Sequence, residues 1–179
     1  VFGAGPNGMI LAQLLKHSNA NQVVCLAPTQ SKLDVLNGYG VDTILMDRKD
    51  PEIHKKAVFE RFPYGVDAIV DATGSASVLP DCFQLLKKQG RLLQFSSTKD
   101  DENITINPAY FYRNELQYYT SYCQVHEFGR AVDAIASGKV RLDKLVTRLY
   151  TLEQFPQAIE DVLDHSVLKL VIRPNGMED

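Results

Sequence analysis

The sequence predicts an α/β fold in which a doubly wound parallel sheet of six strands carries helices on both faces. Two observations favour this fold. Apolar stretches of strand length alternate with stretches of helical pattern, an order typical of β–α–β units. The chain also opens with VFGAGPNGMI, in which a glycine-rich turn leads into a helix and only Val1 and Phe2 come before the turn. The first strand of the predicted sheet is therefore truncated.

The first half of the chain supplies the next three strands. A helix with a broad apolar face follows the glycines, and Pro6 lies where a first helical turn tolerates a missing N–H. A later helix starts at a serine and stops at a glycine, which are common helix-end signals. The predicted strands are Gln22–Ala27, Thr43–Met46 and Asp67–Ala72, and the predicted helices between them are Ser31–Gly38 and Pro51–Phe62.

The second half of the chain completes the sheet, and after the sixth strand the regular alternation of strands and helices ends. A helix over Ser77–Lys88 leads through Gly90 to a fifth strand, Arg91–Ser96, and the polar stretch STKDDENITINP is predicted to be a loop. Leu116–Ser121 is the sixth strand. Two helices, Glu127–Ser137 and Leu152–Asp164, and a last strand, Val167–Ile172, follow.

The composition describes an ordinary soluble globular chain. Of 179 residues, 45% are hydrophobic and 23% charged, and the net charge of -3 gives no electrostatic reason to expect nucleic acid as a partner. No apolar run approaches the roughly 18 residues that a membrane span needs, and no signal peptide precedes the glycines. We therefore expect a cytoplasmic protein without membrane partners, although a targeting signal on a missing N-terminus stays open.

The cysteines and histidines carry no metal-binding pattern. Cys25, Cys82 and Cys123 are isolated and odd in number, so they are predicted to be buried free thiols rather than zinc ligands or a redox pair. The four histidines also lack ligand spacing and are predicted to lie at the surface or to have satisfied partners; they are His17, His54, His126 and His165. No metal ligand is predicted within this chain.

Gly3, Gly5 and Gly8 form a G-x-G-x-x-G loop, which is typical of Rossmann-type dinucleotide folds. The first glycine permits a tight turn, the second lets a pyrophosphate approach the backbone, and the third lets the helix pack closely. The helix N-terminus adds unpaired N–H groups and a partial positive charge. The loop therefore predicts dinucleotide binding, with a glycine turn that binds nothing as the alternative.

The residue at the end of the second strand bears on which dinucleotide binds. An Asp or Glu usually holds the adenosine ribose of NAD here, but this strand ends in Ala27. A carboxylate would repel a 2′-phosphate, so its absence favours NADP. Thr29 and Ser31 could donate hydrogen bonds to that phosphate, and Lys32 could supply charge or simply be a solvated helix residue. The loop has no arginine, so NAD stays open.

Several stretches together resemble the zinc-type medium-chain dehydrogenases, most closely their polyol branch. They are VFGAGPNGMILAQLLK, GVDAIVDATG, LLKKQGRLLQFSS, NELQYYTSY and LVTRLYTLEQFPQAIEDVL followed by LKLVIRP, and they cover nearly the whole chain in the family's order. The resemblance implies an NAD(P)-binding domain over residues 1–145. Residues 146–179 would be the C-terminal segment of a GroES-like catalytic domain, whose larger part, with the zinc ligands, would precede the glycine loop.

The resemblance also implies a set of cofactor-binding positions. Gly3, Gly5, Pro6, Asn7 and Gly8 match the pyrophosphate loop, Ala27 matches the ribose-reading position, and Lys32 matches a basic residue beside the ribose. The further matching residues are Thr73 and Gly74, the nicotinamide segment Phe95, Ser96 and Ser97, the strand-six residues Thr120 and Ser121, and Lys169 near the pyrophosphate. Phe95 could instead be simple core, Thr120 and Ser121 ordinary strand residues, and Lys169 a strand residue without that role. No catalytic residue falls in this chain.

The function implied is hydride transfer between NADP(H) or NAD(H) and the carbinol carbon of an alcohol or polyol, with zinc acting in the absent domain. The parent would be a dimer through strand 116–121, or a tetramer, and the chain alone would be inactive. A zinc-free quinone reductase of the same superfamily and a non-catalytic nucleotide-binding module remain alternatives. A short-chain dehydrogenase is disfavoured because no tyrosine has a lysine four residues later. A methyltransferase is disfavoured by Ala27, since that fold usually ends its second strand in an acidic residue.

Overall fold

The computed structural model describes residues 1–123, 125–164 and 166–176. Its main sheet is parallel, as predicted, and Phe2 lies between two of its strands through isolated bridges to Leu26 and Asp71. Within the described residues, this sheet has five strands, and the single residue Phe2 occupies the place of the truncated first strand. The order is β2–β1–Phe2–β3–β4–β5, with β1 at Val24–Ala27, β2 at Asp42–Leu45, β3 at Val66–Asp71, β4 at Leu86–Gln94 and β5 at Gln117–Thr120.

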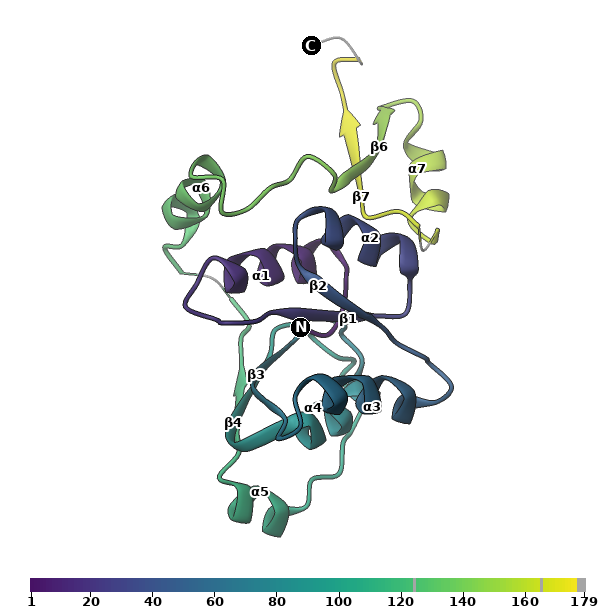
Figure 1. Cartoon of the computed structure of the whole chain (residues 1–179). Coiled ribbons are helices and arrows are strands. Elements are labelled where there is room, and N and C mark those ends of the chain that lie inside the picture. Colours follow the sequence, from purple (N-terminus) through teal and green to yellow (C-terminus); the bar gives the residue numbers. More distant parts are fainter. Residues whose placement is uncertain (124, 165, 177–179) are drawn as a thin grey trace.

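Helices cover both faces of this sheet (Figure 1). On one face α1 (Pro6–Lys16) and α2 (Gln30–Gly38) bury Met9, Leu33 and Leu36 in one apolar cluster. On the other, α3 (Pro51–Arg61) and α4 (Leu79–Leu85) enclose a second cluster that contains Phe2. A short 3-10 helix, η1 (Ala76–Val78), precedes α4. The doubly wound α/β fold is therefore confirmed.

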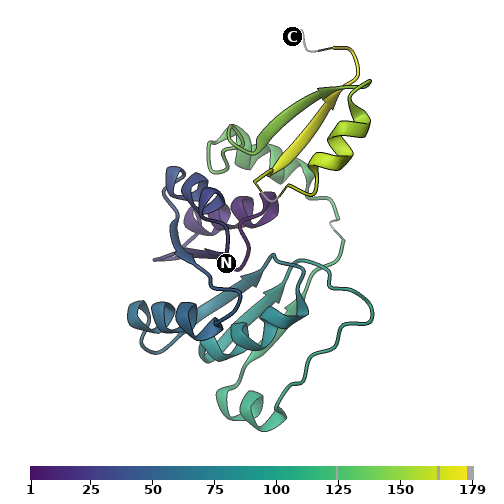
Figure 2. The same cartoon turned by 90° about the vertical axis from the view of Figure 1, so that its right-hand side faces the viewer.

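The C-terminal region forms a separate unit beyond α2 (Figures 1 and 2). It begins with α6 (Phe128–Ala136) and continues with β6 (Val146–Thr151), α7 (Phe155–Asp161) and β7 (Lys169–Arg173), and β6 pairs in parallel with β7 in a second sheet. Gln13 on α1 anchors the unit: its side-chain oxygen accepts from the Arg141 amide at 2.8 Å, and its side-chain nitrogen donates to the Arg141 carbonyl at 3.2 Å. The Lys144 amide also donates to the Tyr39 hydroxyl at 3.0 Å.

Four elements differ from the sequence-based predictions. Helix α5 (Pro108–Asn114) was not predicted; it starts at Asn107, whose side chain accepts from the Tyr110 amide. β6 was not predicted either. The helix predicted to reach Lys88 ends at Leu85, because Leu86 already pairs with Val66 and Gln89 takes a positive φ of 61°. The helix predicted over 152–164 is shorter, as Pro156 lies in its first turn.

Two predictions about single residues were wrong. His54 is neither exposed nor satisfied: it is 1% exposed, and neither ring nitrogen has a hydrogen-bond partner among the described residues. Cys123 is exposed, whereas Cys25 and Cys82 are buried as predicted, and all three are free thiols. His165 lies outside the described residues. Among the described helices, none combines the length and apolarity required to cross a bilayer.

Candidate nucleotide-binding site

The glycine loop joins Phe2 to α1 at the carboxyl end of the strands. Gly3 has a φ of +100°, a conformation that favours glycine, and its amide donates to the Leu26 carbonyl at 2.8 Å. A Cβ at Gly8 would lie 1.9 Å from the Gly3 carbonyl oxygen, so only glycine lets α1 come this close. A Cβ at Gly5 would meet no atom within 4 Å. Gly3 and Gly8 therefore have no room for a side chain, whereas Gly5 faces open space.

The start of α1 suits an anion. Gly5 is the N-cap and has no side chain with which to satisfy the first-turn amides, Pro6 takes the first position, and the first turn carries no acidic residue. Asn7 is exposed beside these groups. The positive end of the helix dipole is therefore uncompensated by any side chain of its own first turn.

Three further segments meet beside this loop, at the ends of β3, β4 and β5. The amides of Phe95 and Ser96 both donate to the Asp71 carbonyl, at 2.9 and 3.3 Å. A Cβ at Gly74 would lie 3.0 Å from the Ser97 carbonyl oxygen, and the Ser121 amide donates to Gln94. These contacts bring together, at the ends of β3, β4 and β5, the predicted residues Thr73, Gly74, Phe95, Ser96, Ser97, Thr120 and Ser121.

Asp71 connects these segments and was missed by the sequence reasoning. It is fully buried at the end of β3, where one carboxylate oxygen accepts from the Thr73 amide at 3.0 Å and from the Thr73 hydroxyl at 2.6 Å. Its second carboxylate oxygen has no partner among the described residues, and burial raises the pKa of the carboxyl group. The signal was present in DAIVDATG, where an acidic residue ends an apolar strand.

The predicted adenosine side lies at the ends of β1 and β2. Ala27 is buried at the last position of β1, opposite Leu45 on β2, and its carbonyl accepts from the Met46 amide at 2.9 Å. Thr29 is the N-cap of α2, but its hydroxyl makes no capping bond. Ser31 is exposed and Lys32 is half-buried in the first turn of that helix. These hydroxyls and this ammonium therefore share one corner of the sheet edge.

Arg48 follows the neighbouring strand β2, which ends at Leu45, and acts electrostatically on Lys32. Burial lowers the pKa of Lys32, Asp164 in the C-terminal unit raises it again, and the positive charge of Arg48 lowers it further. The charge of Arg48 therefore acts on the Lys32 ammonium. Sequence reasoning missed Arg48 because it examined only the loop after the second strand. Since neighbouring parallel strands end at one edge, the residues just after Leu45 were also candidates.

Lys169 is not brought into this group. It is the first residue of β7, in the second sheet, and its side chain is exposed. Asp164 in the C-terminal unit acts on the sheet edge electrostatically, since it raises the pKa of Lys32. Among the residues that the structure describes, no cluster of three or more His, Cys, Asp or Glu side chains could hold a metal ion.

Comparison with known proteins identifies the family. Residues 6–137 match the family model described as zinc-binding dehydrogenase. The chain is 33% identical over 177 residues to D-arabinitol dehydrogenase 1 of Uromyces fabae, covering 98% of this chain and 51% of that protein. It is 23% identical over 180 residues to D-arabitol-phosphate dehydrogenase of Enterococcus avium, covering 99% of this chain and 51% of that protein. The chain belongs to the zinc-binding dehydrogenase family and spans about half the length of these relatives.

Solved structures share the fold over almost the whole chain. One is a zinc-binding dehydrogenase from Sinorhizobium meliloti 1021 bound to NADP, with a TM-score of 0.86, 21% identity, and coverage of 97% of this chain and 51% of that one. Another, from Escherichia coli CFT073, is an alcohol dehydrogenase complexed with NADH, with a TM-score of 0.84, 21% identity, and coverage of 96% and 50%. This likeness confirms the Rossmann-like fold.

Proposed function

We propose that this chain is the cofactor-binding part of a nicotinamide-dependent alcohol or polyol dehydrogenase. The observation that carries the proposal is the glycine loop. Neighbouring atoms leave no room for a side chain at Gly3 and Gly8, while Gly5 leaves open space beside the uncapped start of α1. The polyol dehydrogenases among the relatives support the reaction class. The zinc-free quinone reductase and the non-catalytic module have no comparable support.

Each segment of the sheet edge has a role in this proposal. Gly5 and the first-turn amides of α1 would hold the pyrophosphate, as helix N-termini hold anions. Ala27 would lie beside the adenosine end, and the Phe95–Ser97 segment beside the nicotinamide end. Nicotinamide supplies the hydride chemistry, and this chain binds and orients it. Lys169 reaches the pyrophosphate only if β7 approaches the loop in the longer protein.

We further propose that NADP is preferred to NAD. Ala27 presents no carboxylate to a 2′-phosphate, Thr29 and Ser31 offer hydroxyl donors, and Lys32 and Arg48 supply positive charge. Asp164 partly offsets that charge, but the carboxylate also accepts from Arg148 at 2.6 Å. Both cofactors occur among the structural neighbours, one of which is bound to NADP and another to NADH.

The division into residues 1–145 and 146–179 is part of the same proposal. Large apolar side chains on and beside α7 are exposed, among them Leu152, Phe155, Ile159 and Leu163. This surface supports packing against a catalytic domain that carries the zinc and selects the polyol. The holoprotein would be a cytoplasmic homo-oligomer, and the present chain alone would turn over no alcohol.

Calorimetric titration with NADPH and NADH tests the proposal. Gly5→Ala adds a methyl group where a pyrophosphate would approach, and we expect it to lower affinity at least tenfold while the chain stays folded. Gly129→Ala is the matched control, because its Cβ also meets nothing within 4 Å but lies on α6. Equal affinity of all three proteins would refute binding at the loop, and absence of binding by the folded chain would refute its competence as a cofactor domain.

A further inference from the structure

Gln94 is a polar residue that ends β4 directly after two leucines. Its side chain lies on the same face of the sheet as Leu92, which is fully buried, because side chains alternate along a strand. An amide group on such a face is costly unless both of its ends are hydrogen-bonded. The side-chain oxygen accepts from the Tyr118 hydroxyl, and the side-chain nitrogen donates to the Ser96 carbonyl at 3.1 Å. Gln94 therefore connects Tyr118 on β5 with the backbone of Ser96.

The chemistry of these three groups sets the direction of both hydrogen bonds. A backbone carbonyl only accepts, so the Gln94 amide must turn its nitrogen toward Ser96 and its oxygen toward Tyr118. The Tyr118 hydroxyl must then donate. Burial, and after it the charge of Asp71, raises the pKa of this hydroxyl, which keeps its proton in place. Tyr118 therefore orients Gln94, and Gln94 in turn orients the Ser96 carbonyl.

Tyr118 is itself held by aromatic packing. Its ring meets the ring of Phe83 on α4 edge to face, with 5.4 Å between the ring centroids. Phe83 packs in the same manner on Phe111 of α5, with 4.7 Å between the centroids. Phe83 is buried, and Tyr118 packs against the same apolar cluster. The hydroxyl that orients Gln94 therefore belongs to a ring whose place is fixed by its neighbours.

The Ser96 carbonyl is the part of the nicotinamide segment that the Gln94 side chain holds. The amides of Phe95 and Ser96 donate to the Asp71 carbonyl, which attaches the segment to β3. The Ser121 amide donates to the Gln94 carbonyl, which attaches it to β5. The Gln94 side chain adds a third attachment, at the Ser96 carbonyl. That oxygen has a second lone pair, which can accept an N–H from a bound ligand.

We propose that Gln94 and Tyr118 are positioning residues for the nicotinamide end of the cofactor. Tyr118 orients Gln94, and Gln94 holds the Ser96 carbonyl so that it accepts a hydrogen bond from the carboxamide N–H of nicotinamide. This inference rests on the proposed function, because it requires a nicotinamide cofactor at this edge of the sheet. Both side chains act through one backbone oxygen, so their loss should weaken binding of the nicotinamide end and spare the adenosine end.

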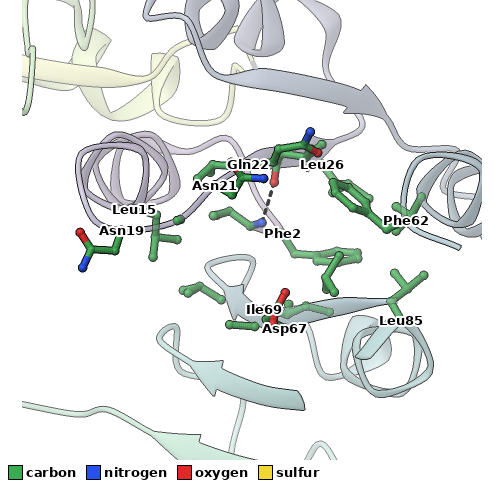
Figure 3. A pocket seen from close by; sticks show the side chains of 18 residues that line it. Phe2, Leu15, Asn19, Asn21, Gln22, Leu26, Phe62, Asp67, Ile69 and Leu85 are labelled. Atoms are coloured by element: carbon green, nitrogen blue, oxygen red, sulfur yellow. Dashed lines mark hydrogen bonds between the residues drawn. The ribbon is translucent and has the colours of Figure 1, made fainter. Parts of the chain in front are cut away.

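The pair lies apart from the cavity of about 660 Å³ between β1 and β3, which Figure 3 shows. Leu26 lines that cavity from β1 and Ile69 lines it from β3, and among its described lining residues none comes from β4 or β5. Replacement of Gln94 or Tyr118 therefore leaves the walls of this cavity unchanged. A change in binding would report on the sheet edge and not on the cavity.

Two titrations test the proposal, one with whichever of NADPH and NADH binds more tightly and one with the corresponding ADP-ribose, which lacks nicotinamide. Gln94→Met keeps the length of the side chain without its hydrogen bonds, and Tyr118→Phe keeps the ring without its hydroxyl. We expect each variant to bind the dinucleotide about three- to tenfold more weakly and the ADP-ribose with unchanged affinity. The two changes combined should weaken binding no more than Gln94→Met alone, since Tyr118 acts through Gln94.

A second Tyr–Gln pair, on β5, supplies matched controls. The Tyr119 hydroxyl donates to the Gln117 side-chain oxygen at 2.8 Å, and both residues are exposed. Tyr119→Phe and Gln117→Met should leave both affinities unchanged. Equal weakening of the two ligands by Gln94→Met and Tyr118→Phe, or no weakening of either ligand, would overturn the positioning role. Absence of binding of either ligand by the unaltered chain would instead refute the proposed function, and this inference with it.

Discussion

At the scale of single residues, the nucleotide-binding edge depends on small side chains with particular surroundings. Gly8 is fixed by a contact of 1.9 Å that any Cβ would make with the Gly3 carbonyl oxygen. Ala27 is buried at the end of β1, where it presents no carboxylate to the region beside Lys32. Gly8 therefore bears on folding, and Ala27 on the choice of cofactor.

Replacement of Ala27 by aspartate should reverse that choice. A carboxylate at this position repels a 2′-phosphate by roughly 1–4 kcal/mol, so Ala27→Asp should lower NADPH affinity at least about fivefold. Ala27→Asn has nearly the same shape without the charge and should retain more of the NADPH affinity. Titration of both variants with NADPH and NADH measures the effect. The same loss in the two variants would assign it to size and not to electrostatics.

We expect His54 to make the stability of the fold sensitive to acid. It is buried with its ring 6.3 Å from that of Phe2, and burial lowers its pKa from 6.5, against the opposing influence of Asp81, Glu52 and Asp47. A depressed folded-state pKa means that the unfolded chain binds the proton more readily. The stabilisation is therefore complete above about pH 6.5 and is lost as the pH falls below it, by at most about 1.4 kcal/mol per pH unit for one proton.

Urea unfolding between pH 5 and 7 measures this contribution. The original chain should lose stability toward pH 5, and His54→Leu should flatten that part of the profile. His17→Gln, a change at an exposed histidine, should keep the original slope. An unchanged slope in His54→Leu would move the acid sensitivity to other groups.

At the scale of elements, β5 is one of the two edge strands of the main sheet within the described residues, the other being β2. The Ser121 amide donates inward to Gln94, so the alternate residue Thr120 turns its amide outward. Exposed edges of this kind pair readily with a second copy. If the dimer forms through strand 116–121, Thr120→Pro removes an outward donor and should convert dimer to monomer in sedimentation experiments. Thr120→Ala retains the donor and should remain a dimer; dimers in both variants would place the interface elsewhere.

The elements also show how far sequence reasoning reaches. The strands of the main sheet were predictable because apolar runs of strand length alternate with helical patterns, and the glycine loop indicated where ligands bind. Helix α5 was missed because its flanking stretch is polar and only the Asn107–Pro108 pair marks its start. The end of α4 was missed because pairing of Leu86 with Val66 overrides a helical pattern that continues to Lys88. Tertiary pairing of this kind leaves little local signal.

The residues of the candidate site also fall into those that the sequence predicted and those that it did not. Residues in a recognisable loop, such as Gly3 and Gly8, were found from the sequence. Arg48 and Asp71 were not, because their relevance depends on which strands are neighbours: β2 pairs with β1, so the residues after β2, Arg48 among them, follow the strand beside Ala27. His54 likewise looks polar in sequence and is buried by the packing of α3 against Phe2.

At the scale of the whole molecule, Gln13 links the sheet domain to the C-terminal unit. It is buried and makes hydrogen bonds with both backbone groups of Arg141. Gln13→Leu keeps an apolar stem but leaves those groups unpaired, and it should lower the free energy of unfolding by about 1–3 kcal/mol. Gln157→Leu, at an exposed glutamine on α7, should change it by less than about 0.5 kcal/mol. Similar effects in both variants would show that the link contributes little.

The position of Phe2 has a consequence for cooperativity. Phe2 packs in one buried cluster with Leu26 of β1 and Ile69 of β3, and its backbone bonds to both strands, so the two parts of the sheet should unfold together. In the proposed complex the adenosine end would lie beside β1 and β2, and the nicotinamide end beside β3, β4 and β5. A bound dinucleotide would then contact both parts and raise the temperature at which the whole sheet unfolds.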